Sequence, residues 1–263
     1  MKDMKVSGIQ LDVMYNQPKE NFEKVHSSIN QLMEKEKPDV ILLPEMWNVS
    51  FFPDELEGVA DYEGTETRAL LSRLAKEHAV NIVGGSVATK YDGHFYNTSY
   101  VYNREGQLVH TYHKVHLFSP ANEHEKFKRG DHLGLVEMDG VKVGIATCYD
   151  LRFVEWIRLM ALKGMEVLFV PAAWPHPRLQ VWQTLLKARA IENQIYVVGV
   201  NTCGATDDLK FCGHSAVISP LGKVITELNE SEETFTENLD LSKLKGIRKD
   251  IGVFKDRRPE LYH

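Results

Sequence analysis

The stretch Val141-Lys-Val-Gly-Ile-Ala-Thr-Cys-Tyr-Asp-Leu-Arg-Phe153 carries the strongest fold signal in the chain. An apolar strand gives way at Cys148 to a polar turn, and a helical pattern follows over about 153–163. Gly164 suits the left-handed position just after a helix end, and residues 167–170 are again apolar and strand-like. This strand–turn–helix–strand order is typical of an α/β fold.

The same alternation extends in both directions from this stretch. Upstream, apolar residues at three- and four-residue spacings predict helices from Pro18 onward and over 65–78, and each helix precedes a strand. Asp139-Gly140 predicts a two-residue hairpin turn. The strands expected from apolar runs lie at 39–44, 81–88, 97–102, 108–112, 195–200, 214–218, 223–226 and 235–239, with a further helix at 179–192. Neither a flexible linker nor a repeat interrupts the series, so one domain over residues 1–263, with two sheets covered by helices, is expected.

Composition and charge exclude several classes of partner. The chain has 263 residues, with 31 Lys and Arg against 37 Asp and Glu, a net charge of -6. No dense basic block is visible, so no nucleic acid partner is expected. The N-terminus lacks the apolar core of a signal peptide, and no run of about 18 apolar residues exists, so no membrane partner is expected. Three cysteines, an odd number, predict reduced thiols in a cytoplasmic protein rather than a disulfide framework.

Cys148 is the most informative single position. It lies where a strand passes into a turn and a helix, a place where reactive side chains gather. The positive end of a helix dipole near the sulfur stabilises a thiolate, which favours a nucleophile. The alternative is a buried core cysteine, since cysteine is among the most buried residue types.

Two charged residues follow other predicted strands. Glu45 comes directly after the apolar run that ends at Pro44, where partial burial raises the pKa of a carboxylate towards that of a general base. Lys114 follows the strand at 108–112 and suits stabilisation of an oxyanion. A cap or a solvated surface charge explains either residue taken singly. Glu45, Lys114 and Cys148 each follow a separate strand, however, and sites in α/β sheets form beyond the carboxyl ends of strands.

Three blocks of sequence resemble the signature blocks of the nitrilase superfamily, the carbon–nitrogen hydrolases. They are Leu42-Leu-Pro-Glu45-Met, His113-Lys114-Val-His-Leu-Phe118 and Thr147-Cys148-Tyr-Asp-Leu-Arg-Phe153. Their order and long spacings match the family, and the similarity runs over essentially the whole chain. The resemblance implies a single-domain, four-layer α-β-β-α sandwich and a cysteine-dependent amidase.

The resemblance also implies roles for individual residues. Cys148 attacks the carbon of an amide or nitrile, Glu45 is the general base, and Lys114 stabilises the oxyanion together with the backbone N–H of Tyr149. The family places a second glutamate between the lysine and cysteine blocks. Glu123 matches it best, and Glu125 is the competitor.

The downstream segment resembles the ω-amidase-type branch, which hydrolyses the terminal amide of small α-keto acid amides. The matching residues are Pro171-Ala-Ala-Trp-Pro175, Arg178, Trp182 and the run 185–194. Two departures put the substrate in doubt: Val154 stands where the branch has proline, and the segment 47–52 lacks its usual Thr-Gly.

A substrate carboxylate needs a cation, ideally a bidentate arginine. Arg152 and Arg178 are the candidates, with pairing of Arg152 to Glu155 and helix capping by Arg178 as the alternatives. Trp174 and Trp47 are expected to contact the substrate. Trp47 also belongs to an aromatic cluster with Phe51 and Phe52, which suits either a pocket wall or a dimer contact.

The remaining clusters favour no special chemistry. His110, His113 and His116 alternate sides of a strand, and Cys203, Cys212 and His214 flank an irregular turn, so no metal is expected. A thiol, carboxylates and an ammonium cover every step of amide hydrolysis, so no cofactor is expected either. The resemblance further implies a small-molecule amide substrate and a homodimer or higher homo-oligomer, in which the tail at about 251–263 reaches a neighbouring subunit.

Three rival functions remain open from the sequence. Nitrilases and N-carbamoyl-amino-acid hydrolases belong to the same superfamily. A papain-like hydrolase lacks its local signature around Cys148. A scaffold protein that retains the fold without catalysis predicts an unreactive Cys148.

Overall fold

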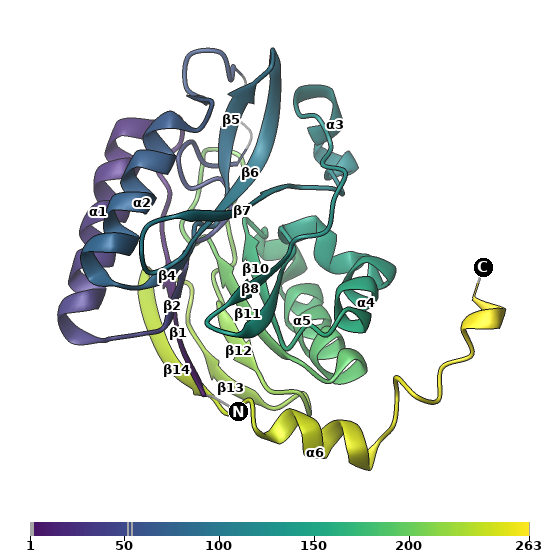
Figure 1. The fold of residues 1–263 in the computed structure, drawn as a ribbon. Helices are drawn as coiled ribbons and strands as arrows, with labels where there is room; N and C mark the ends of the chain where they lie inside the picture. Colours follow the sequence, from purple (N-terminus) through teal and green to yellow (C-terminus); the bar gives the residue numbers. More distant parts are fainter. Residues whose placement is uncertain (1–2, 52, 54, 263) are drawn as a thin grey trace.

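The computed structural model describes residues 3–51, 53 and 55–262, and it shows two β-sheets packed face to face with helices on both outer faces (Figure 1). This arrangement confirms the α-β-β-α sandwich expected from the sequence. Residues 1, 2 and 263 of the proposed 1–263 domain lie outside the described residues.

The first sheet has the strand order β14-β1-β2-β4-β6-β5-β3, and β7 also pairs with β6. The strands β1, β2 and β4 are parallel to one another, so their carboxyl ends meet at one edge of the sheet. The bounds are β1 (Met4–Gln10), β2 (Val40–Leu42), β3 (Asp61–Tyr62), β4 (Asn81–Val83), β5 (Val87–Tyr91), β6 (His94–Tyr102), β7 (Leu108–His113) and β14 (Glu233–Leu239).

The second sheet has the order β13-β12-β11-β10-β9-β8, and its central strands β9, β10 and β11 are parallel. Parallel strands buried on both faces explain the nearly continuous apolar runs seen in the sequence. The bounds are β8 (Leu135–Met138), β9 (Val141–Ile145), β10 (Val167–Ala172), β11 (Tyr196–Asn201), β12 (Ala216–Ile218) and β13 (Val224–Glu227).

Three apolar layers hold the sandwich together. Between the sheets, Val6 and Val40 of the first sheet share a core with Phe169 and Val198 of the second. One outer layer packs α1 (Pro18–Lys35) and α2 (Thr65–His78) on the first sheet, and the other packs α4 (Val154–Leu162) and α5 (Leu179–Asn193) on the second. The core between the sheets therefore holds together strand ends that are far apart in the sequence.

Two expected elements differ from the structure. The strand expected at 81–88 is split into β4 and β5 at Gly84 and Gly85. Gly85 has a φ of +59°, and a Cβ there would lie 2.0 Å from the carbonyl oxygen of Pro44. The helix expected from Phe153 begins at Val154, and the short 3-10 turn η2 (Cys148–Arg152) precedes it.

Several short elements were not expected from the sequence. They lack the long apolar periodicity that identifies a helix or strand. They are α3 (Glu123–Lys126), α6 (Lys243–Asp250), η1 (Ser119–Ala121), η3 (His176–Arg178), η4 (Pro259–Leu261) and the strand β3.

The β8–β9 hairpin offers a test of local backbone strain. Its turn is the expected Asp139-Gly140, with φ of +50° and +80°. Gly140→Ala is expected to lower the free energy of unfolding by about 1–2 kcal/mol, because alanine disfavours the left-handed conformation. Gly246→Ala in α6 is the control, because an added Cβ meets nothing within 4 Å at either site. Gly246 lies in a helix, where alanine is preferred to glycine. Its replacement is therefore expected to raise the free energy of unfolding by roughly 0.5–1 kcal/mol. Denaturant titration measures both, and equal shifts in the two variants would contradict this account.

Candidate active site

The residues singled out from three separate strand ends come together between the two sheets. Glu45 follows β2, Lys114 follows β7, and Cys148 follows β9, while Glu123 opens α3. Glu45, Lys114 and Glu123 are fully buried, and Cys148 is 7% exposed. Because charged side chains are buried only when they are paired, the cluster requires an internal partner for each charge.

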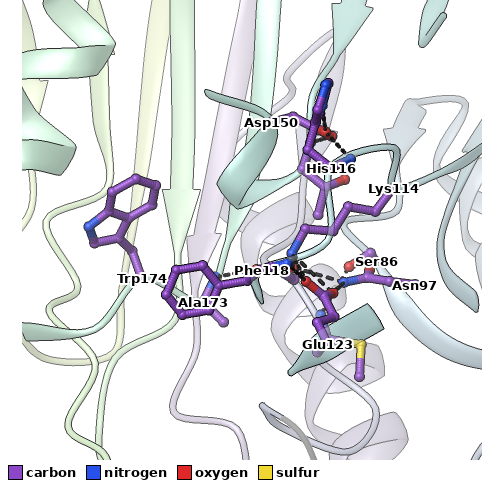
Figure 2. Close-up of polar contacts among 12 residues, drawn as sticks. Ser86, Asn97, Lys114, His116, Phe118, Glu123, Asp150, Ala173 and Trp174 are labelled. Atoms are coloured by element: carbon purple, nitrogen blue, oxygen red, sulfur yellow. Dashed lines mark hydrogen bonds and ion pairs between the residues drawn. The ribbon is translucent and has the colours of Figure 1, made fainter. Parts of the chain in front are cut away.

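The ammonium of Lys114 supplies that partner for both carboxylates (Figure 2). Its Nζ donates to Oε1 of Glu45 at 2.8 Å and to Oε2 and Oε1 of Glu123 at 2.9 and 3.1 Å. The structure thus places Glu123, and not Glu125, beside the lysine.

Three further donors hold the carboxylates. The Nδ2 of Asn97 donates to Oε1 of Glu45 at 2.8 Å and to Oε1 of Glu123 at 3.2 Å. The backbone N–H of Ala173 donates to Oε2 of Glu45 at 2.8 Å, and that of Phe118 donates to Oε2 of Glu123 at 2.5 Å. Asn97 was not expected at the site from the sequence. Asparagine is depleted in strands, so its presence in a run of strand-forming residues does indicate a special role for this side chain.

The charges of the cluster act on one another through a poorly hydrated interior. Burial by itself lowers the pKa of Lys114, but Glu123 and Glu45 outweigh it and raise the pKa well above its usual value, so the ammonium is retained. Burial and the nearby charge of Glu45 raise the pKa of Glu123, and Lys114 opposes this only in part. The site therefore carries a cation, Lys114, and one carboxyl group, Glu123, whose pKa is raised.

Cys148 lies at a strained elbow between β9 and η2. Its φ is +47°, in the left-handed region that few residues other than glycine adopt. Such strain costs roughly 1–3 kcal/mol and is concentrated at functional sites. At this elbow the thiol is close enough to the carboxylate of Glu45 and the ammonium of Lys114 for both charges to act on it.

The expectation that a helix dipole stabilises a thiolate is wrong. The helix α4 begins only at Val154, beyond the short η2 turn. Burial, and then the charge of Glu45, raise the pKa of the Cys148 thiol well above its usual value, while Lys114 lowers it to a smaller extent. The raised pKa favours the protonated thiol at neutral pH, with the charge of Glu45 acting on it.

A pocket opens beside the Cys148 sulfur. Its lining residues come mainly from η2 and from the segment after β10: Phe51, Phe118, Cys148, Tyr149, Arg152, Ala173, Trp174, Pro175 and Arg178. The structure thus places Arg152, Trp174, Arg178 and Tyr149 around one cavity.

Both pocket arginines lie over aromatic rings. The guanidinium of Arg152 is 5.2 Å from the ring centre of Trp174, and that of Arg178 is 5.5 Å from the ring centre of Phe118. Within the described part of the chain neither guanidinium is paired with a carboxylate, so the expected alternative of an Arg152–Glu155 pair is not seen. Arg178 directly precedes α5 but makes no side-chain cap.

The prediction that Trp47 contacts the substrate is wrong. Its ring is fully buried in the core beneath α1, where it packs edge-on against Phe22 at 4.9 Å and donates from Nε1 to the carbonyl of Gly84 at 2.7 Å. Phe51 of the same aromatic cluster lines the pocket instead. Phe52 lies outside the described residues.

The other two cysteines have no such setting. Cys203 and Cys212 are buried, and burial raises the pKa of each to about 12. Over residues 3–51, 53 and 55–262, no group of three or more His, Cys, Asp or Glu side chains is arranged to hold a metal ion. No helix in this described part is long and apolar enough to cross a membrane.

A buried thiol within the field of a carboxylate and an ammonium, and open to a pocket, suits an enzyme that cleaves acyl bonds through a covalent cysteine intermediate. The sequence profile of the family described as "Carbon-nitrogen hydrolase" matches residues 5–249, and the chain belongs to this family. It is therefore a hydrolase of carbon–nitrogen bonds.

Comparison with individual proteins agrees with this assignment. The chain is 41% identical to the 2-oxoglutaramate amidase of Bacillus subtilis (strain 168) over 98% of both chains. It is 34% identical to the omega-amidase NIT2-B of Xenopus laevis over 92% of this chain and 91% of that one. Among solved structures, XC1258 of Xanthomonas campestris, a CN-hydrolase superfamily protein with an arsenic adduct in the active site, superimposes with a TM-score of 0.90 at 28% identity, covering 98% of each chain.

The charge environment of Cys148 predicts opposite effects of two substitutions. Glu45→Gln removes a negative charge and a proton acceptor, so it is expected to lower the pKa of the thiol and to speed alkylation at pH 7 by about tenfold. Lys114→Met removes the cation and is expected to raise that pKa further and to slow alkylation. The measurement is the pH dependence of Cys148 labelling by iodoacetamide, followed by peptide mass spectrometry. Cys203 and Cys212 in the same digest serve as controls, and a Cys148 pKa unchanged by Glu45→Gln would refute the assignment.

Proposed function

We propose that this hydrolase removes the terminal amide of a small linear 2-oxo acid amide as ammonia, as an ω-amidase does. The observation that carries the proposal is the ammonium of Lys114 held between Glu45 and Glu123, together with the Cys148 thiol that lines the adjoining pocket within the field of these charges. The printed names of the 2-oxoglutaramate amidase and the omega-amidase support the substrate class.

The first half-reaction forms a thioester. As the sulfur of Cys148 attacks the amide carbon, Glu45 accepts the thiol proton, which removes the barrier set by the raised thiol pKa. The negative charge that develops on the amide oxygen is stabilised by Lys114 and the backbone N–H of Tyr149. The protonated Glu45 then gives its proton to the nitrogen, the carbon–nitrogen bond breaks, and ammonia leaves.

The second half-reaction hydrolyses the thioester. Glu45, again ionised, takes a proton from water as the water oxygen attacks the thioester carbon. The carbon–sulfur bond breaks, the proton returns to the sulfur, and the acid is released. Glu123 has a different role: its two contacts to Nζ and its bond from the Phe118 N–H fix the position of Lys114.

The pocket arginines are proposed to bind the substrate carboxylate. Arg152 and Arg178 are half-buried, lie on aromatic rings and reach the same cavity as the sulfur. A guanidinium without a carboxylate partner in a partly dry pocket binds an anionic group more strongly than one in water. Trp174 supplies an apolar wall beside Arg152.

The substrate class is tested with a panel of amides scored by ammonia release. The enzyme is expected to act on 2-oxoglutaramate and to show little activity on a nitrile or an N-carbamoyl amino acid. Cys148→Ala and Glu45→Gln are each expected to abolish release, by about 10³-fold or more. Turnover of the nitrile alone would exclude the amidase proposal, and full activity of Glu45→Gln would exclude the mechanism.

The same panel tests the arginines. Arg152→Met or Arg178→Met is expected to raise KM for 2-oxoglutaramate while leaving turnover of an uncharged short amide within about threefold. An equal loss of activity on charged and uncharged amides would show that the arginines do not bind the substrate carboxylate.

We also propose that the chain is a single domain, that it assembles as a homodimer or larger homo-oligomer, and that it works in the cytoplasm. The three free cysteines and the thiol chemistry support a reducing compartment. The tail beyond α6 leaves the body of the molecule (Figure 1), and its Ile251, Leu261 and Tyr262 are exposed. Exposed apolar residues on α4 and α5, among them Leu159 and Ile191, extend this unpartnered surface.

The assembly is tested by placing a charge on that surface. Leu159→Glu is expected to shift the protein from dimer to monomer in sedimentation velocity at micromolar concentration, because a charge in an apolar interface is costly. Leu221→Glu is the matched control, since Leu221 is 68% exposed in a turn between β12 and β13 and Leu159 is 46% exposed. A monomeric parent protein would contradict the proposal.

A further inference from the structure

A third buried carboxylate lies next to Glu45 and Glu123 and has no part in the chemistry described above. Asp150 is fully buried and accepts four hydrogen bonds. Its Oδ1 accepts from the backbone N–H of His116 at 2.9 Å and from His116 Nδ1 at 2.7 Å. Its Oδ2 accepts from the Tyr112 hydroxyl at 2.7 Å and from the backbone N–H of Thr147 at 2.9 Å.

These four bonds join the two segments that carry the reacting groups. Thr147 immediately precedes Cys148, at the end of a strand of the second sheet. His116 lies two residues after Lys114, in the segment from the first sheet whose Phe118 N–H holds Glu123. Figure 2 shows the Asp150–His116 contact beside Lys114 and Glu123. The carboxylate of Asp150 thus connects the turn that carries Cys148 to the segment that carries Lys114.

Further contacts hold the hydrogen-bonded residues around Asp150 in place. The His116 ring stacks on Phe153 with centres 3.7 Å apart and planes 13° apart. The Tyr112 hydroxyl also accepts a bond from Trp156 Nε1 of α4 at 3.2 Å. At the other end of η2, the buried guanidinium of Arg189 donates to the carbonyls of Leu151 and Arg152 at 2.9 and 3.1 Å. The strained Cys148 backbone is therefore clamped on both sides.

We propose that Asp150 is a positioning residue, which sets the distance between the Cys148 sulfur and the Glu45–Lys114 pair. The inference rests on the proposed hydrolytic mechanism. Proton transfer and attack require the reacting atoms to be held about 3–3.5 Å apart. A misplacement of about 1 Å costs about a hundredfold in rate.

The geometry also says why an amide cannot replace the carboxylate. Each oxygen of Asp150 accepts a hydrogen bond from one backbone N–H. A backbone N–H can only donate, so both positions need an acceptor atom. In Asp150→Asn the NH2 group must therefore face an N–H of either Thr147 or His116, whichever way the amide is turned. One of the two segments is released, although the side chain keeps its size.

The first experiment compares Asp150→Asn with Asp131→Asn, the same substitution at a side chain that is 95% exposed. Asp150→Asn is expected to lower kcat for amide hydrolysis about a hundredfold, with KM within about threefold, and to change the rate of Cys148 alkylation, because the charges of Glu45 and Lys114 then act on the sulfur from different distances. Asp131→Asn is expected to leave all three quantities unchanged. The concentration of active sites is taken from the folded fraction measured by circular dichroism and gel filtration, so that unfolded protein is not counted.

A pair of substitutions at His116 keeps the inference testable if Asp150→Asn does not fold. Asn matches the Nδ1–H donor of histidine in reach, whereas leucine has no donor. His116→Leu is expected to lower kcat by at least about tenfold, and His116→Asn is expected to recover most of that loss.

The outcomes separate the inference from the function on which it rests. A parent protein that releases no ammonia from any amide overturns the proposed function, and the alkylation rates then still test the positioning role. A kcat per active site of Asp150→Asn within about threefold of the parent overturns the inference alone. So does a His116→Asn variant as impaired as His116→Leu.

Discussion

The burial of the Lys114 ammonium between two carboxylates is the interaction on which the site depends. Removing a charge from water costs several kcal/mol, and only close partners with further hydrogen bonds offset that cost. Glu45 and Glu123 supply the charge, and Asn97, Ala173 and Phe118 supply the bonds that satisfy the carboxylates. Because these partners come from both sheets and from the loops between them, the ammonium can be buried only when the whole sandwich has assembled.

The same dry interior determines how the cysteine works. Burial and a nearby carboxylate raise the pKa of a thiol and favour its protonated form. Cys148 therefore differs from a cysteine at a helix N-terminus, which is ionised at neutral pH. In the proposed mechanism a neutral thiol reacts with the help of a nearby base, Glu45. The thiolate then forms only as the sulfur reacts, and the lysine is left to stabilise charge on the substrate. This division of roles explains why a base and a cation are both buried beside one sulfur.

The resemblance of the three blocks around Glu45, Lys114 and Cys148 predicted the family and the layers. The structure brings these three residues together, because each block ends a strand and strand ends meet at one edge of a sheet. The helices and most strands were also predictable from apolar periodicity. Trp47 was assigned to the pocket because it belongs to an aromatic run, but composition cannot tell which side of a loop faces the core. The split at Gly84 and Gly85 was missed because it arises from a close approach to Pro44, a residue from another strand.

What the sequence by itself determined is the order of strands and helices and the three blocks that carry Glu45, Lys114 and Cys148, since both depend on local pattern and on side-chain chemistry. Only the tertiary structure decided how these residues act on one another. The protonation of Cys148 depends on burial and on a charge 103 positions away in the sequence. The joint at Asp150 and the pairing of Asn97 with both carboxylates depend on distances between separate segments. Such distances are set by the packing of two sheets, and no local stretch of sequence specifies them.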